Sequence, residues 1–202
     1  MKRRCRLHIR YRKRPSVAGP YFQKSSWAPF VYQGVTYDVK HLNEYELTVV
    51  DTDDVPRLIA VTFADHCFTR VPEVGDDPAL TYPASDRCPG IFCFKRYALT
   101  FGLVAHIAHA AAGHVWSVDG DSFAAVPVVD QSGKRVLYGI IFSLAPVTGL
   151  PVHLHMRVKT AYPVDENDLV TFGKVRFRHL VALRMKGKRP GRNTSQRRKA
   201  PK

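Results

Sequence analysis

The chain has 202 residues, of which 45% are hydrophobic, enough for one sizeable folded domain but cramped for two. Its net charge of +14 is unevenly placed, because residues 2–14 and residues 186–202 each hold eight Lys or Arg and no acidic residue. The middle is left with fifteen basic and seventeen acidic residues, so the positive charge lies in two arms. No apolar run reaches about 18 residues and no secretory leader is evident, which predicts a cytoplasmic protein without a membrane span.

Three parts are expected along the chain: a basic arm with an aromatic, Pro-rich connector (1–36), a single α+β domain (37–185) and a basic tail (186–202). Arms of this composition are typically disordered and bind polyanions by counterion release. The aromatic side chains of the connector are expected to pack onto the body rather than to stack bases.

Apolar periodicity predicts the elements of the domain. Five segments have the composition of strands, with turn residues between them: 46–50, 57–62, 123–129, 136–145 and 152–159. Segment 91–97 is mixed, and the Ala-rich residues 99–114 predict one main helix that stops near Gly113. A last short element is expected over 172–183. The fold class is therefore α+β, an antiparallel sheet or meander with one main helix.

The most informative segment is Val-His-Leu-His-Met-Arg-Val-Lys at 152–159, in which apolar and polar residues alternate strictly. A strand would turn the apolar set to the core and would align the polar set on the opposite face: His153, His155, Arg157 and Lys159. Imidazoles can move protons near neutral pH, and fixed cations can stabilise a pentavalent phosphate. The same alternation is also typical of an ordinary solvated sheet face. Thr160 and Tyr162 would lie on that face only if a β-bulge near Lys159 reversed the alternation.

Two further clusters suit phosphate chemistry. His66 and Arg70 lie four residues apart, and Arg96 precedes the main helix, where it would clamp a phosphate or remain a surface cation. Cys67 is disfavoured as a nucleophile, because adjacent His66 would point away from it. The four cysteines form no CxxC pair and are expected to be reduced thiols. We predict no metal and no cofactor.

Several short motifs, taken together, resemble known families: HCFTR at 66–70, FKRYALT at 94–100, YGIIF at 138–142 and VKTAYP at 158–163. They resemble small bacterial proteins labelled stationary-phase growth adaptation proteins and, more distantly, the barnase–EndoU–colicin–RelE-like nucleases. The resemblance covers about 45–183. It implies a small α+β nuclease that cleaves RNA without a metal, and it points to His66, Arg96, Thr160 and Tyr162.

The resulting hypothesis is a toxin-like, metal-independent endoribonuclease in which the RNA 2′-hydroxyl attacks its own phosphate. The expected catalytic residues are His66, Arg96, His155, Thr160 and Tyr162. The expected nucleic-acid-binding residues are Arg70, His153, Arg157, Lys159, Lys186, Lys188, Arg189, Arg192, Arg197 and Arg198. RNA or the ribosome is the expected partner, with an antitoxin-like protein as a further one. The alternative is a non-catalytic nucleic-acid-binding protein that uses the same arms and the cationic sheet face.

Overall fold

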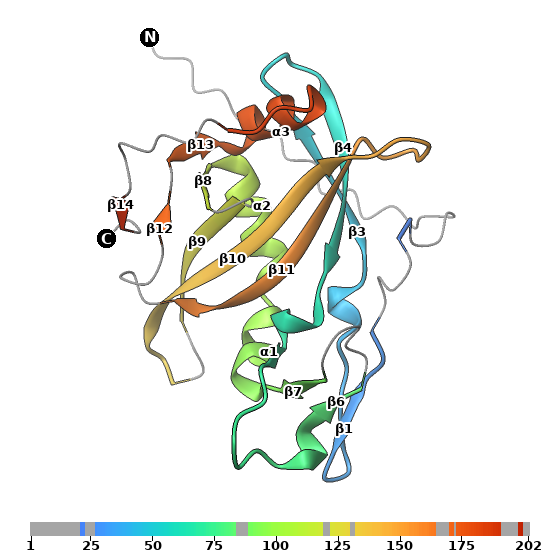
Figure 1. The fold of residues 1–202 in the computed structure, drawn as a ribbon, viewed down its shortest axis with the longest axis vertical. Coiled ribbons are helices and arrows are strands. Elements are labelled where there is room, and N and C mark those ends of the chain that lie inside the picture. The colour runs from blue at the N-terminus through green and yellow to red at the C-terminus, as the bar shows by residue number, and fades with distance from the viewer. Residues whose placement is uncertain are drawn as a thin grey trace.

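A computed structural model describes residues 21–22, 27–83, 89–118, 122–129, 132–164, 170–171, 173–190 and 198–199. The protein is α+β: a large curled sheet carries three helices, and a smaller lobe lies at one end (Figure 1). The large sheet has seven strands in the order β13-β8-β9-β10-β11-β4-β3. Their bounds are β3 Tyr45–Val50, β4 Pro56–Phe63, β8 His114–Ser117, β9 Ser122–Val129, β10 Arg135–Pro146, β11 Leu154–Val164 and β13 Lys174–Arg176.

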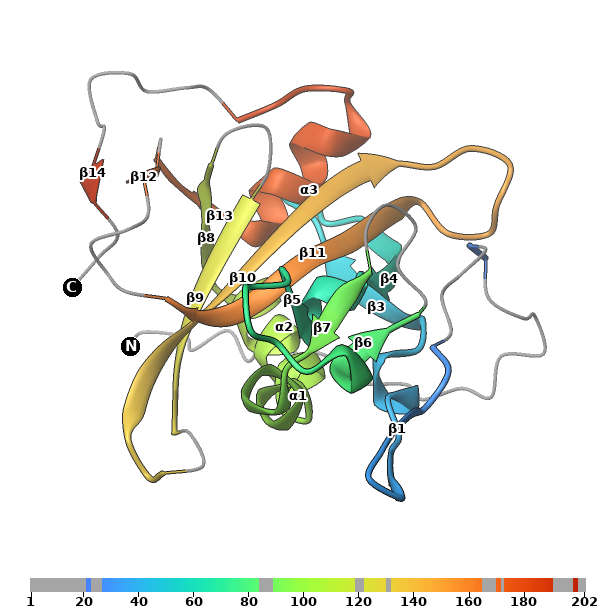
Figure 2. The same cartoon turned by 60° about the horizontal axis from the view of Figure 1, so that its bottom comes forward.

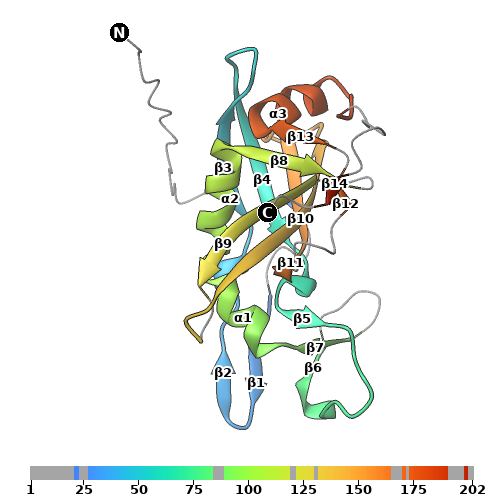
Figure 3. The same cartoon turned by 90° about the vertical axis from the view of Figure 1, so that its left-hand side faces the viewer.

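Helices α2 (Leu103–Ala112) and α3 (Phe177–Met185) cover one face of this sheet, the inner face. Helix α1 (Phe94–Thr100) lies at the end of the sheet, next to the smaller lobe (Figure 1). Figure 3 shows α2 on one side of β9 and β10, and the core forms where its apolar residues meet the strands. Phe142 of β10 lies 6.0 Å from Phe177 of α3, measured between ring centroids. Leu154, Met156 and Val158 of β11 are buried in the same core, as their alternation predicts.

The smaller lobe supports α1 (Figure 2). It contains a three-stranded sheet in the order β5-β7-β6 and a separate hairpin of two strands. The bounds are β1 Phe30–Tyr32, β2 Val35–Tyr37, β5 Thr69–Arg70, β6 Thr81–Tyr82 and β7 Gly90–Phe92. Three 3-10 helices join these elements: η1 Lys40–Leu42, η2 Asp65–Cys67 and η3 Pro78–Leu80. Stacked rings such as Phe30 on Phe92, with centroids 4.3 Å apart, hold the lobe together.

The structure corrects the predicted sheet at one strand pair. β9, β10 and β11 form the expected antiparallel meander, and β8, which the sequence did not predict, extends it; β11, however, pairs with β4 in parallel, with Leu154 opposite Ile59. The five residues from Ile59 to Phe63 are all buried. Four of the five are apolar and the fifth is Thr62, and a largely apolar run of this kind is typical of a strand covered on both faces.

The structure also corrects the predicted helix, which is two helices separated at Gly102. A Cβ on Gly102 would lie 2.7 Å from the His106 Nε2 atom, so glycine gives this imidazole room while weakening the helix. Gly113 does cap α2, as predicted. The last element over 172–183 is β13 followed by α3, whose Phe177, Leu180 and Val181 have helical spacing and are buried.

Most of the two arms, which we predict to be disordered, lies outside the described residues. Within the tail, Arg198–Lys199 form β14 and pair antiparallel with β12 (Val170–Thr171). Val170 and Thr171 are residue types that favour extended backbone, but the sequence does not indicate which distant segment β12 pairs with.

Candidate nucleic-acid interface

The face of the large sheet opposite the helices, here called the outer face, is built around a β-bulge in β11. Ile141 of β10 pairs with Thr160, while the next residue, Phe142, pairs with Val158, so the register shifts and Lys159 is one extra residue in β11. The bulge reverses the alternation of β11. Thr160 and Tyr162 therefore join His155 and Arg157 on the outer face, and the condition set by the sequence is met. The outer face also carries Trp116, Phe123, Ile141 and Ser143, by register with these residues.

Four predicted residues from three distant segments meet at the Tyr162 end of this face. Arg96 Nη1 donates to the His66 carbonyl oxygen at 2.9 Å and to the Thr69 carbonyl oxygen at 2.8 Å. Thr160 Oγ1 also donates to the His66 carbonyl, at 3.3 Å. Arg96 lies over the Tyr162 ring, with Cζ 5.0 Å from the ring centroid. The His66 side chain itself is exposed, and only its backbone carbonyl contacts Arg96 and Thr160.

His155 is not part of this cluster. It lies five residues before Thr160, roughly 16 Å along the strand. Its Nε2 shares a 2.7 Å hydrogen bond with Thr62 Oγ1, and Phe22 stacks on its ring with centroids 3.7 Å apart. Burial and the nearby Arg157 lower the pKa of His155 to about 4. This imidazole is therefore neutral at pH 7, which suits stacking better than proton donation.

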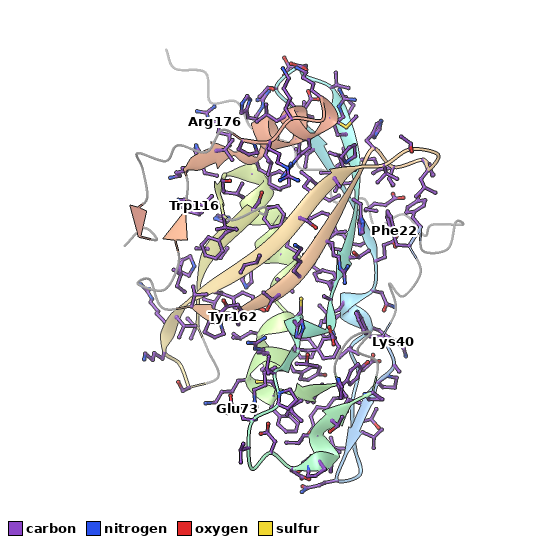
Figure 4. All side chains as sticks on the ribbon, viewed as in Figure 1. Phe22, Lys40, Glu73, Trp116, Tyr162 and Arg176 are labelled. Carbon is purple, nitrogen blue, oxygen red and sulfur yellow. The ribbon has the colours of Figure 1, made fainter. Side chains whose placement is uncertain are left out.

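Trp116 of β8 is an aromatic group of the outer face that sequence analysis missed. Lys174, directly opposite on β13, places Nζ 5.4 Å from the Trp116 ring centroid. A cation over an indole is a favourable pair, and Figure 4 shows Trp116 and Tyr162 on neighbouring parts of the same sheet. The alternation of His-Val-Trp-Ser at 114–117, with Val115 buried, is the signal that could have indicated it.

The other predicted binding residues have different surroundings. Arg70 forms a two-pronged pair with the Asp76 carboxylate, away from the outer face. His153 precedes β11, and its Nδ1 accepts a hydrogen bond from the Leu58 backbone N–H at 3.0 Å. Arg157 and the bulge residue Lys159 are exposed. Of the predicted set, Arg157 is thus the exposed cation that stands in the middle of the outer face.

The basic residues after α3 are only partly described. Lys186 pairs with Asp53 of the β3–β4 turn at 2.9 Å, so its charge is partly neutralised. Lys188 and Arg189 are exposed. Arg192 and Arg197 lie outside the described residues, and Arg198 is placed only by its backbone in β14.

The Cys67 thiol faces the core and not the outer face. It is fully buried, burial raises its pKa to about 12, and a thiol in that state is a poor nucleophile. Within the described residues no three His, Cys, Asp or Glu side chains are grouped as metal ligands would be. In the same part of the chain, the helices are all too short or too polar to cross a lipid bilayer.

The fold and the site define a small α+β protein whose open sheet face presents aromatic rings and cations. Comparison with models of known families matches residues 29–185 to the YjaZ family. The match spans most of the chain and ends with the last residue of α3, so the protein belongs to the YjaZ family. Neither the curated proteins nor the solved structures include a match to the chain.

The family match shows that the resemblance to stationary-phase growth adaptation proteins and to the barnase–EndoU–colicin–RelE-like nucleases is wrong. The motifs that suggested it are short, and segments such as VKTAYP satisfy the general requirements of a strand that ends in a turn. Two strands of the large sheet, β3 and β4, also precede the α-helices in this chain.

Proposed function

We propose that the protein binds single-stranded RNA on the outer face of its large sheet. The observation that carries the proposal is the bulge at Lys159, which unites His155, Arg157, Thr160 and Tyr162 on one face. Without it, the aromatic and hydroxyl groups would point into the core and the cations would be isolated.

The chemistry of this face fits an unpaired strand. Bases stack on exposed rings regardless of sequence, and Trp116 and Tyr162 are half-buried with a cation beside each. Arg157 stands exposed between them and His155, where it can contact a phosphate. The hydroxyls of Ser143 and Thr160 on the same face offer partners for a ribose 2′-hydroxyl. The basic arms would add affinity that does not depend on sequence.

The test is the fluorescence anisotropy of a labelled uridine oligonucleotide titrated with the full chain. Tyr162→Leu combined with Trp116→Leu should weaken binding by about 1–3 kcal/mol for each base that loses its platform. Tyr32→Leu is the matched control, because Tyr32 is a half-buried tyrosine on the β1–β2 hairpin of the smaller lobe. An equal loss in all variants would show that the outer face is not the binding surface.

RNA cleavage is a second candidate, and the convergence of His66, Arg96, Thr160 and Tyr162 favours it. In this scheme the exposed His66 imidazole takes the proton of a 2′-hydroxyl, whose oxygen attacks the adjacent phosphorus. The bond from phosphorus to the 5′-oxygen breaks, and that oxygen takes a proton from Tyr162 or from water. Arg96 stabilises the pentavalent phosphate, and the products are a 2′,3′-cyclic phosphate and a 5′-hydroxyl.

Cleavage and binding are separated by one substitution. His66→Gln should abolish cyclic-phosphate products while leaving oligonucleotide affinity within twofold, because its side chain makes none of the contacts that hold the cluster. His109→Gln, an exposed histidine of α2, is the control. Intact RNA with both proteins, in the presence of normal binding, would leave binding alone as the function.

A further inference from the structure

One short segment of the connector lies across the His155 end of the outer face. Two carboxylates hold it: Glu44 accepts from the backbone N–H groups of Tyr21 and Phe22, at 2.8 and 3.2 Å. Glu46, an outer-face residue of β3, accepts from the Tyr21 hydroxyl at 2.6 Å. The segment is therefore fixed by polar contacts at the edge of the sheet, and Figure 4 shows Phe22 beside the strands there.

The anchored segment places the Phe22 ring flat on His155. The two rings are nearly parallel, at 13°, with centroids 3.7 Å apart, which is the geometry that a nucleobase adopts on an aromatic side chain. Thr62 holds the His155 ring from its edge through the Nε2 hydrogen bond. The His155 imidazole is thus fixed in orientation. Within the described residues, the group that stacks on its face is the flat ring of Phe22.

The other two half-buried aromatic groups of this face are covered differently. Tyr162 has Arg96 over its ring, and Trp116 has Lys174. A cation over a ring still leaves the other ring face for a base and can itself meet a phosphate. Phe22 offers neither charge nor polar group to RNA. It excludes a base from His155 by occupying the same volume.

We propose that the His155 ring is a stacking site for an unpaired nucleobase and that Phe22 occupies this site until RNA displaces it. This inference rests on the proposed function. Residues Tyr21 and Phe22 are then a latch, held by Glu44 and Glu46, that competes with RNA for one of the three half-buried aromatic positions of the outer face. Binding releases the latch, and removal of the Phe22 ring should tighten binding.

The chain offers a closely matched control. Phe101, at the end of α1, stacks on His41 with centroids 4.4 Å apart, and His41 Nε2 lies 2.6 Å from Thr100 Oγ1. Both sites therefore combine a phenylalanine, a histidine and a threonine hydroxyl. Only the Phe22 site is on the outer face, since His41 and Phe101 lie in η1 and at the end of α1.

The experiment measures the affinity of the full chain for a fluorescein-labelled single-stranded uridine oligonucleotide of about ten nucleotides, by anisotropy. Phe22→Ala should lower the Kd by about 2- to 12-fold, the range that corresponds to the loss of one competing ring stack. Phe101→Ala should leave the Kd within twofold. NMR titration of His155 in the same variant reports whether the latch has opened, because loss of burial should raise its pKa towards the ordinary value.

The outcomes separate this inference from the proposed function. If wild type binds and Phe22→Ala binds equally or more weakly, although the His155 titration shows an exposed ring, the latch is overturned and RNA binding stands. If Phe22→Ala binds where wild type does not, both are supported. If neither protein binds the oligonucleotide, the proposed function is overturned and the latch with it.

Discussion

The two ends of the outer face share a strand but differ in what holds their polar residues. At the Tyr162 end, after the bulge, the His66 side chain is exposed and Arg96 ties three segments together. At the His155 end, before the bulge, the imidazole is hydrogen-bonded to Thr62, covered by Phe22 and neutral at pH 7. The Tyr162 end therefore suits a charged group such as a phosphate, and the His155 end suits a flat ring such as a nucleobase.

The difference shows that residues on one face of an alternating strand need not share the same chemical properties. His155 and Tyr162 lie on the same face, yet neighbours from other elements decide the ionisation and accessibility of each. His66 belongs with Tyr162 although it is almost one hundred residues away in sequence. The histidine that the strand pattern favours for proton transfer is the one that burial makes unsuitable for it.

Removing the bulge should remove the Tyr162 end from the outer face altogether. Deletion of Lys159 would place Thr160 and Tyr162 on the inner face and would turn Ala161 outward. We expect the free energy of unfolding, measured with urea, to fall by more than about 3 kcal/mol, since buried polar groups would lose their partners. Lys159→Ala keeps the extra residue and should cost less than about 1 kcal/mol. Equal effects would show that the bulge does not set the faces.

The Tyr162 end depends on Arg96 for stability, whereas Arg157 should matter only for binding. Arg96→Ala removes the donor to two carbonyl oxygens, so we expect a loss of about 2 kcal/mol in urea unfolding. Arg157→Ala, at an exposed position, should change stability by less than about 0.5 kcal/mol. A larger loss with Arg157→Ala would reverse the assigned roles.

Acid should destabilise the protein through His155. Its folded pKa is below the ordinary value of about 6.5, so the unfolded chain takes up a proton first as the pH falls. The stability conferred by the neutral ring is complete above pH 6.5 and is lost progressively towards pH 4. With allowance for solvent screening, wild type should lose about 1 kcal/mol more than His155→Gln between pH 7 and pH 5. His109→Gln should behave as wild type does, and identical pH profiles for all three would mean that His155 is not held neutral.

The smallest expected effect is on the salt dependence of RNA binding. Arg157→Ala should lower the slope of log Kd against log salt by about 0.7, since one phosphate contact to a single strand is lost. Lys186→Ala should change the slope less, because Asp53 already neutralises that ammonium group. The reverse order would assign the phosphate contacts to the tail rather than to the sheet.

Much of β11 can be predicted from its sequence, because burial of alternate residues leaves a direct record in the order of amino acids. The bulge cannot be predicted in this way, because no residue type near Lys159 marks where the strand register shifts. The sequence shows only what a bulge there would do to Thr160 and Tyr162. The contact between Phe22 and His155 leaves no local pattern, because it joins residues 133 positions apart. The parallel pairing of β4 with β11 is hidden in the same way, apart from the largely apolar segment 59–63.

The most direct measurement is photo-crosslinking of the full chain to a single-stranded RNA that contains 4-thiouridine, followed by identification of the modified peptides. RNA bound on the outer face should crosslink to peptides that contain Trp116, Tyr162 and His155, and Phe22→Ala should strengthen the crosslink at His155. Crosslinks confined to residues 1–20 and 186–202, with none in the sheet, would show that only the arms bind RNA and would contradict the role assigned to the outer face.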